Sequence, residues 1–252
     1  MTQRRRQDLI LEKVQATGFV TIDELVEHFQ VTPQTIRRDL NQLAQDNKLR
    51  RHHGGAGVES STENTAYQAR KIMDLDAKEK IAQQLVKIIP DGASLFINIG
   101  TTTETIARAL LNHNNLRVVT NNLHVASILC AKEDFTVIVA GGEVRNRDGG
   151  IVGEATRDFI NQFQMDFGII GISGIHSDGT LLDFDYREVR VAQTIMANSR
   201  QVLLAADHSK FGRNAMVRLG NIAQADHFFT DQAPPAEIRQ QLIDHQVELH
   251  VV

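Results

Sequence analysis

The feature that most constrains how this chain folds is the stretch TPQTIRRDL at residues 32–40. It opens with a threonine that can cap a helix and a proline that fits the first helical position, where no hydrogen-bond donor is lost. Ile36, Leu40 and Leu43 then recur at spacings of four and three residues. This spacing predicts a short helix with one buried face.

The opposite face of the predicted helix carries side chains that recognise DNA. Arginine pairs with guanine, asparagine and glutamine pair with adenine, and all of them also bind phosphate. Taken alone, such a face is about as consistent with an ordinary solvated helix, so the neighbouring elements decide. The side chains on this face are Gln34, Thr35, Arg37, Arg38 and Asn41.

The preceding residues supply the context of a helix-turn-helix unit. Apolar periodicity over residues 9–14 predicts a first helix, and residues 19–22 predict a very short strand. Thr21 and Glu24 then have the spacing of a capping box that opens a second helix. Helix, strand, helix, turn and helix is the order of this DNA-binding motif. We therefore expect the polar face of the third helix to contact DNA.

A wing is expected after the third helix. Residues 48–53 (KLRRHH) are predicted to pair with residues 19–22 as a two-stranded wing, with the following glycines as its exit. The wing would meet the DNA backbone. Neighbouring histidines in a strand point to opposite faces, so no metal site is expected here. The residues predicted to contact DNA are Thr21, Thr32, Gln34, Thr35, Arg37, Arg38, Asn41, Arg50, Arg51 and His52.

Charge is distributed unevenly along the chain. Residues 1–57 carry nine Lys and Arg against seven Asp and Glu, whereas the remainder carries eighteen against twenty-four. A mildly basic head on an acidic body is consistent with a nucleic-acid contact confined to the head. The sequence has no run of eighteen apolar residues and no signal-peptide core, so we expect a cytoplasmic protein with no membrane partner. The single cysteine, Cys130, has small apolar neighbours and is expected to pack in the interior.

The body has the pattern of an α/β fold. Beyond a linker predicted at residues 58–75, apolar strand-like runs alternate with helical ones over residues 76–252, which predicts a largely parallel sheet. Ligands of such sheets bind at the carboxyl ends of the strands. The strands are expected at residues 94–99, 117–120, 136–140, 167–171, 201–205 and 227–230.

Groups that bind anions follow two of these strands. Gly100 lets the backbone approach an anion, three threonine hydroxyls can donate to it, and the next helix adds its dipole. Asn121 and Asn122 follow the neighbouring strand, so a second set of polar donors converges there. A plain helix cap needs only one threonine, so we expect phosphate or carboxylate binding. The threonines are Thr101, Thr102 and Thr103.

Further candidates lie closer to the C-terminus. Asp183, Asp185 and Glu188 cluster around a turn, where they could accept hydrogen bonds from ligand hydroxyls or cap the following helix, and the local sequence leaves both open. Lys210 is expected to supply a point charge for a phosphate. The adjacent Asp-His-Ser run is no catalytic triad, because nucleophile, base and orienting group must converge from separate places.

The head holds several residues at fixed spacings: Arg6, Ile10, Val14, Thr32 and the run TIRRDL at residues 35–40. This pattern resembles the signature of the DeoR family of bacterial transcriptional regulators. The signature includes Asp39, which we expect to hold Arg37, Arg38 or a neighbouring backbone donor, since a carboxylate facing phosphate would repel it.

The body resembles the sensor domain of the same family, which is similar to ribose-5-phosphate isomerase and related sugar-phosphate enzymes. The resemblance implies a repressor, released from double-stranded operator DNA by a phosphorylated inducer that Gly100 to Thr103, Asn121, Asn122 and Lys210 would hold. The stretches LLDFDY and DHSKFGRNAMV resemble a branch of the family for which glycerol 3-phosphate is the expected inducer and glycerol metabolism the regulated process. The family resemblance further implies a homotetramer.

No enzymatic activity is expected. The isomerases carry acid–base aspartates in an Asp-Gly-Ala-Asp motif, whereas the corresponding stretch here, GISGI at residues 171–175, has no carboxylate. We therefore predict binding without turnover, with no catalytic residue, cofactor or metal ion. The alternatives are a related repressor induced by another phosphorylated sugar or polyol, and a sugar-phosphate isomerase or deaminase with a DNA-binding head. Asn98 stands where family members commonly have an aspartate, so the inducer could differ here.

Overall fold

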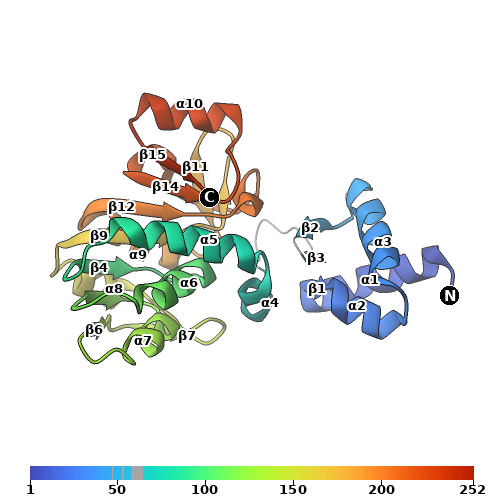
Figure 1. Cartoon of the computed structure of the whole chain (residues 1–252), viewed down its shortest axis with the longest axis horizontal. Helices are drawn as coiled ribbons and strands as arrows, with labels where there is room; N and C mark the ends of the chain where they lie inside the picture. Colours follow the sequence, from blue (N-terminus) through green and yellow to red (C-terminus); the bar gives the residue numbers. More distant parts are fainter. Residues whose placement is uncertain (47, 53, 58–64) are drawn as a thin grey trace. The chain divides into compact units, whose positions relative to one another are not determined.

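The computed structural model describes residues 1–46, 48–52, 54–57 and 65–252. It divides into two compact units, Met1–Leu75 and Asp76–Val252 (Figure 1). The predicted linker at residues 58–75 lies partly outside the described residues, and its remainder contains the short helix α4 (Tyr67–Ile72). None of the helices among the described residues is long and apolar enough to span a membrane.

The head forms the predicted helices with the predicted start signals. Thr32 accepts a hydrogen bond from the backbone amide of Thr35 at 3.3 Å, and a proline follows as the first helical residue. Thr21 and Glu24 form a complete capping box, with hydrogen bonds of 3.1 and 2.8 Å. The three helices are α1 (Gln3–Thr17), α2 (Ile22–Phe29) and α3 (Pro33–Gln45).

The small sheet of the head differs from the predicted wing. Its central strand is β3 (Gly55–Gly57), which pairs antiparallel with both β1 (Phe19–Thr21) and β2 (Arg50–His52). The predicted direct pairing of residues 48–53 with residues 19–22 is therefore wrong. Only glycine fits at position 55, because a Cβ there would lie 2.3 Å from the backbone oxygen of Val20. Gly55 is thus part of the sheet, whereas Gly54 lies in the turn before β3.

A buried ion pair joins α1 to α3. Arg6 Nε donates to Asp39 Oδ2 at 2.5 Å, and the two residues are 8% and 1% exposed. Asp39 therefore holds Arg6, from another helix, and not Arg37 or Arg38 as predicted. The pair borders the apolar core of the head, whose fully buried side chains include Ile10, Leu25, Ile36 and Leu40.

The second unit is built on a seven-stranded parallel sheet, which confirms the predicted α/β fold class. All six expected strands are present, and the seventh, β15, was not predicted from the sequence. In spatial order the strands are β15 (Glu248–Val251), β14 (His227–Thr230), β12 (Ser199–Ala205), β9 (Met165–Gly171), β4 (Ser94–Ile97), β5 (Arg117–Thr120) and β6 (Thr136–Val139).

Helices cover both faces of this sheet. Successive strand residues point to opposite faces, so Leu95 packs in one apolar cluster and Phe96 in the other. The first cluster includes side chains of α5 (Leu75–Leu85), α6 (Thr101–Leu110) and α7 (Leu123–Leu129). The second includes side chains of α8 (Glu154–Ile160), α9 (Tyr186–Ala197) and α10 (Ala236–Asp244).

The second unit also contains small antiparallel sheets. β7 (Glu143–Arg145) and β8 (Gly150–Val152) form an antiparallel pair. A second small sheet contains β10 (Gly174–Ile175), β11 (Thr180–Asp183) and β13 (Val217–Asn221).

Cys130 does not pack in the interior. It is exposed at the C-terminal cap of α7, where its Sγ lies 3.3 Å from the carbonyl oxygen of Ser127. The prediction of a packing role is therefore wrong, because the apolar stripe of α7 ends at Leu129, one residue earlier.

Replacing Asp39 with asparagine is expected to destabilise the head by about 3–5 kcal/mol, because the buried Arg6 guanidinium loses its counter-charge. Denaturant unfolding of the full chain, followed by circular dichroism, measures this change in the head's transition. Asp46→Asn is the matched control, since it removes an exposed carboxylate from the end of the same helix, and it should stay within about 0.5 kcal/mol. An equal effect of both variants would contradict the role of the ion pair.

Candidate functional site

The exposed face of α3 carries the side chains predicted to contact DNA. Gln34, Arg37, Arg38 and Asn41 are exposed, and Thr35 is half-buried. The opposite face is fully buried in the head core. The hydroxyls of Thr32 and Thr35 lie 2.9 Å apart, and Thr21 is engaged in the capping box, so the two capping threonines stabilise helix starts.

The strand β2 brings a second basic group towards this face. The Arg51 guanidinium donates to the carbonyl oxygen of Gly55 at 2.9 Å. Burial, and then the positive charge of Arg37, lower the pKa of Arg51 below its ordinary value. Arg51 and Arg37 are therefore close enough to repel one another. The negative charge of a DNA phosphate backbone would relieve this repulsion. Arg50 is half-buried, and the side chain of His52 lies outside the described part of the chain.

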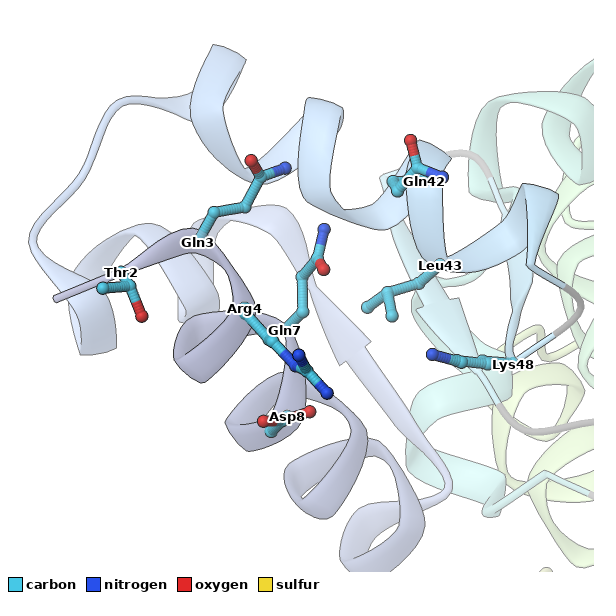
Figure 2. A pocket seen from close by; sticks show the side chains of 8 residues that line it. All are labelled: Thr2, Gln3, Arg4, Gln7, Asp8, Gln42, Leu43 and Lys48. Atoms are coloured by element: carbon cyan, nitrogen blue, oxygen red, sulfur yellow. The ribbon is translucent and has the colours of Figure 1, made fainter.

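A polar hollow of about 680 Å³ lies between α1 and the C-terminal half of α3 (Figure 2). It contains none of the residues predicted to contact DNA, and most of its lining is polar. It does not resemble the mostly apolar pockets that bind small molecules. The lining residues are Thr2, Gln3, Arg4, Gln7, Asp8, Gln42, Leu43 and Lys48.

In the second unit, Gly100 lies in the turn between β4 and α6, where anion binding was predicted. Gly100 has φ 148°, a conformation that other residues rarely adopt, and it caps α6 without any side-chain hydrogen bond. The first amides of a helix have no intrahelical partner and carry the positive end of its dipole. Thr101 and Thr102, each 7% exposed, are the first residues of α6. Thr103 instead shapes the loop, donating to the carbonyl oxygens of Asn98 and Gly100.

Two buried amide oxygens lie at the carboxyl ends of the adjacent strands β4 and β5. Asn98 and Asn121 are 2% and 0% exposed, and the Oδ1 atom of each has no hydrogen-bond partner among the described residues. An acceptor that is buried without a partner is costly, so both oxygens are suited to accept a hydrogen bond from a bound molecule. Asn122, by contrast, is occupied: its Oδ1 caps α7 through the amide of His124 at 2.9 Å.

A buried group of opposite charges follows β12. Lys210 Nζ lies 3.3 Å from Asp207 Oδ2 and 3.1 Å from Ser209 Oγ. Burial favours the protonated acid, but the positive charges of Lys210 and Lys78 outweigh it and hold the pKa of Asp207 well below its usual range. Lys78, on α5, is 2% exposed. Two lysines therefore act on one buried carboxylate.

Sequence reasoning missed Lys78. Its signal was present, because Lys78 shares the helical stripe of Ile81 and Leu85, the buried residues of α5. A charged residue on an otherwise apolar stripe is rarely buried unless it is paired.

Two of the three predicted carboxylates, Asp185 and Glu188, contact an arginine that the sequence did not reveal. Arg145 is 8% exposed and contacts Asp148 at 2.7 Å, Asp185 at 3.1 Å and Glu188 at 2.7 Å. Asp185 also caps α9, accepting from the amide of Arg187. Of the two readings left open by the sequence, the helix cap therefore holds for Asp185. The stretch around Arg145 resembles an ordinary charged turn, which gave no signal.

Asp183 and Glu188 are linked electrostatically. Asp183 Oδ1 accepts from the hydroxyl of Ser173 at 3.0 Å. Burial, and then the charge of Asp183, raise the pKa of Glu188 to about 7, although Arg145 acts in the opposite direction. The surroundings of Glu188 therefore favour its protonated form more than water does.

The charged cluster and the Gly100 turn are adjacent. Arg145 pairs with Gly150 across the β7–β8 hairpin, and a Cβ at Gly150 would lie 2.5 Å from the side chain of Ile99. A Cβ at Gly171, where β9 ends, would lie 3.7 Å from Thr103. The predicted effector residues on these elements therefore gather around the carboxyl ends of the central strands.

Comparisons with known families match both units. Residues 6–62 match the family described as a DeoR-like helix-turn-helix domain, and residues 73–232 match the DeoR C terminal sensor domain.

Full-length relatives carry the same type of name. The chain is 57% identical to a glycerol-3-phosphate regulon repressor of Escherichia coli over 100% of both chains. It is 53% identical to one of Haemophilus influenzae, over 93% of this chain and 91% of that protein. It is 43% identical to the HTH-type transcriptional repressor CsqR of Escherichia coli, over 99% and 95%.

Solved structures share the α/β architecture at low similarity. Ribose 5 phosphate isomerase A from Neisseria gonorrhoeae matches with a TM-score of 0.40 and 15% identity, over 53% of this chain and 52% of that one. eIF2B beta from Chaetomium thermophilum matches with a TM-score of 0.48 and 15% identity, over 68% and 54%. Likenesses of this size say nothing about function.

The raised pKa of Glu188 predicts a specific pH dependence. Between its ordinary value of 4.5 and about 7, the folded chain keeps a proton that the unfolded chain loses. The group's contribution to stability is thus present below pH 4.5 and is lost as the pH rises to about 7. From about pH 5 to pH 7.5, the unfolding free energy of the wild type should fall by about 1–3 kcal/mol relative to Glu188→Gln. The exposed Glu237→Gln variant serves as the control, and parallel curves for wild type and Glu188→Gln would contradict the buried acid.

Proposed function

Because this chain belongs to the DeoR family of transcriptional regulators, we propose that it represses genes of glycerol metabolism and is released from DNA by glycerol 3-phosphate. The observation that carries the proposal is its 57% identity, over the full length of both chains, to a glycerol-3-phosphate regulon repressor. The geometry of the two units supports each half of the proposal separately.

The head would bind double-stranded operator DNA through α3. Arg37, Arg38 and Asn41 are exposed on the face opposite the core, where they can reach base edges in the major groove. Arg51, close to Arg37, and Arg50 would contact the phosphate backbone. Gln34 and Thr35 join them at the N-terminal end of the helix.

The phosphate of the inducer would bind at the start of α6. The backbone after Gly100, the hydroxyls of Thr101 and Thr102 and the ammonium of Lys210 supply donors of the kinds that a phosphate needs. Lys78 acts electrostatically on Asp207, the carboxylate that contacts Lys210. Thr103 and Asn122 hold the surrounding turns in place.

The hydroxyls of the inducer would meet the buried amide oxygens. Glycerol 3-phosphate has two hydroxyl groups, and Asn98 and Asn121 each offer one acceptor that lacks a partner among the described residues. Asp183, Asp185 and Glu188 act as positioning residues in this proposal. They orient Ser173 and Arg145 beside the Gly100 turn.

Release of DNA requires that the inducer prefer one conformation. A ligand that bound both conformations equally would shift nothing. We propose a cytoplasmic homotetramer whose heads occupy repeated operator half-sites, and whose inducer-bound conformation holds the heads at a spacing that does not fit them.

Each of the two alternative functions is suggested by one residue: Asn98 suggests a repressor with a different inducer, and Glu188 suggests an enzyme. Asn98, in place of an aspartate, favours a related repressor with a different phosphorylated inducer. Glu188, with a pKa of about 7, is in the range of a general acid or base. Its carboxylate is held by Arg145 at 2.7 Å, so we propose binding without turnover. A coupled assay of the full chain with ribose 5-phosphate tests this, and turnover at enzymic rates would contradict it.

The proposal predicts ligand-dependent DNA binding. At fixed salt concentration, the full chain should bind promoter DNA of its own glycerol genes, and glycerol 3-phosphate should lower the affinity by about 5–150-fold, the usual range of allosteric coupling. Fluorescence anisotropy of labelled DNA measures both. Glycerol, inorganic phosphate and glucose 6-phosphate are the controls. Release by another phosphate alone would contradict the inducer assignment, and absence of DNA binding would contradict the assignment of α3.

A further inference from the structure

Two histidines and a glutamate converge on the edge of the large sheet, away from the Gly100 turn. His227 begins β14, and Glu248 begins the adjacent edge strand β15. The strands are parallel, with His227 opposite Glu248 and Phe229 opposite His250. The cluster lies near the amino ends of these strands, whereas the proposed effector site lies at the carboxyl ends of the strands of the sheet.

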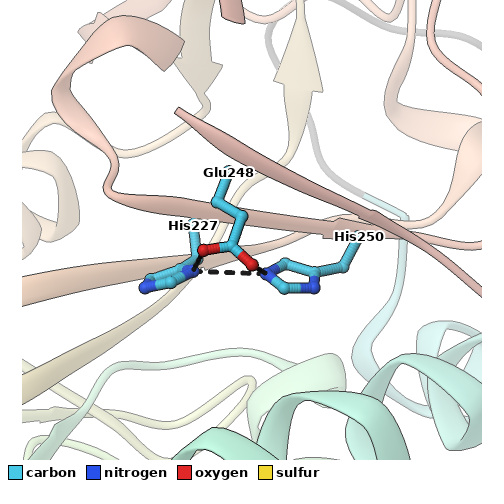
Figure 3. A group of neighbouring side chains, drawn as sticks. All are labelled: His227, Glu248 and His250. Atoms are coloured by element: carbon cyan, nitrogen blue, oxygen red, sulfur yellow. Dashed lines mark hydrogen bonds and ion pairs between the residues drawn. The ribbon is translucent and has the colours of Figure 1, made fainter. Parts of the chain in front are cut away.

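The spacing of the three side chains matches a metal site. His227 Nδ1 lies 3.2 Å from His250 Nε2, while Glu248 Oε2 lies 3.4 Å from His227 Nδ1 and Glu248 Oε1 lies 3.4 Å from His250 Nε2 (Figure 3). Tetrahedral zinc, with bonds of about 2.0–2.1 Å, places its ligand atoms about 3.3–3.4 Å apart. The separation of the two nitrogens is close to one edge of such a tetrahedron, and each nitrogen has a carboxylate oxygen at a similar distance. One ligand atom from each residue lies within 4.8 Å of the other two.

The surroundings hold the imidazoles in position. The His250 ring stacks on Phe229 with 4.3 Å between centroids and 5° between planes. The side chains of His227 and His250 are 14% and 13% exposed, whereas that of Glu248 is 64% exposed. The cluster therefore has a fixed, mostly buried nitrogen pair and a carboxylate at the surface, where a further ligand position can open to solvent.

We propose that His227, Glu248 and His250 bind one divalent transition-metal ion, with Zn²⁺ as the best fit and water as the fourth ligand. Two imidazoles and one carboxylate are the donor set of several zinc sites with an open position. Mg²⁺ and Ca²⁺ prefer six or more oxygen ligands and do not suit this set. The ion ties the edge strand β15 to β14, and it acts independently of DNA and inducer.

The site was not visible in the sequence. His227 and His250 are separated by 22 residues, without the short spacing of a metal motif. They become neighbours only because β15 pairs in parallel with β14, and the sequence did not predict β15 as a strand.

The test uses the untagged full-length chain, freed of metal by a chelator and titrated with Co²⁺ and then Zn²⁺. Tetrahedral Co²⁺ absorbs visible light strongly, whereas octahedral Co²⁺ absorbs weakly. We expect an intense band that saturates at one Co²⁺ per chain and is abolished by Zn²⁺. Zn²⁺ should also raise the midpoint of thermal unfolding, because it binds only the folded chain.

Variants separate a metal site from a hydrogen-bonded cluster. His250→Gln and Glu248→Gln should each lower Zn²⁺ affinity by at least about 10–100-fold. Mutating a residue that merely hydrogen-bonds to a metal ligand already causes a loss of this size. Glu248 is mostly exposed, so its variant leaves the core intact, which circular dichroism checks. His245→Gln, an exposed histidine at the end of α10, is the matched control and should bind as the wild type does.

Two results would overturn the proposal. One is a weak, octahedral Co²⁺ spectrum or no binding in the wild type. The other is equal Zn²⁺ affinity in the wild type and the folded Glu248→Gln and His250→Gln variants. In either case the three side chains are joined only by the His227–His250 hydrogen bond and the ion pairs with Glu248.

Discussion

The proposed effector site depends on the parallel alignment of the large sheet. Because all seven strands run the same way, the turns that follow β4, β5, β9 and β12 meet at one edge. This alignment places Asn98, Gly100, Asn121 and Lys210 around the same edge, although up to 112 positions separate them in the sequence. The topology therefore brings these groups together, and the chemistry of their side chains determines which ligand they can bind.

Buried charge is the second constraint, and the two units use it differently. In the head, Arg6 and Asp39 neutralise one another and fix α1 against α3. The pair therefore stabilises the position of α3 from its buried side. In the second unit, the positive charges of Lys78 and Lys210 both act on the buried carboxylate of Asp207 and keep it ionised. In the proposed function, Lys210 also contacts the phosphate of the inducer.

Local signals predicted the parts of the structure that local rules govern. The caps at Thr21 and Thr32 and the apolar stripe of α3 are set by residues three or four apart, and the structure confirms them. The six expected strands are also present, and the family predicted from the head and body patterns is the one that both units match.

What the sequence could not show depends on long-range pairing. The partner of Asp39 lies 33 positions away on another helix, and β3 is recognisable as a strand only through its pairing with β1 and β2. Arg145 contacts Asp148 in its own hairpin, but also Asp185 and Glu188 at the start of α9, 40 and 43 positions away. The metal-like cluster of His227 and His250 depends on an edge strand. In each case the partners are chosen by tertiary packing, which periodicity and spacing do not encode.

The central claim is that a phosphate bound beside α6 controls the head, and Lys210 offers the most direct test. Anisotropy of labelled operator DNA measures the glycerol 3-phosphate concentration that gives half release from the wild type, Lys210→Gln and the exposed control Lys87→Gln. We expect Lys210→Gln to bind the DNA normally but to need about 10–100-fold more glycerol 3-phosphate, because a hydrogen bond to a charged group contributes about 1.5–3 kcal/mol. Lys87→Gln should match the wild type. Equal half-release concentrations for Lys210→Gln and the wild type would contradict the account.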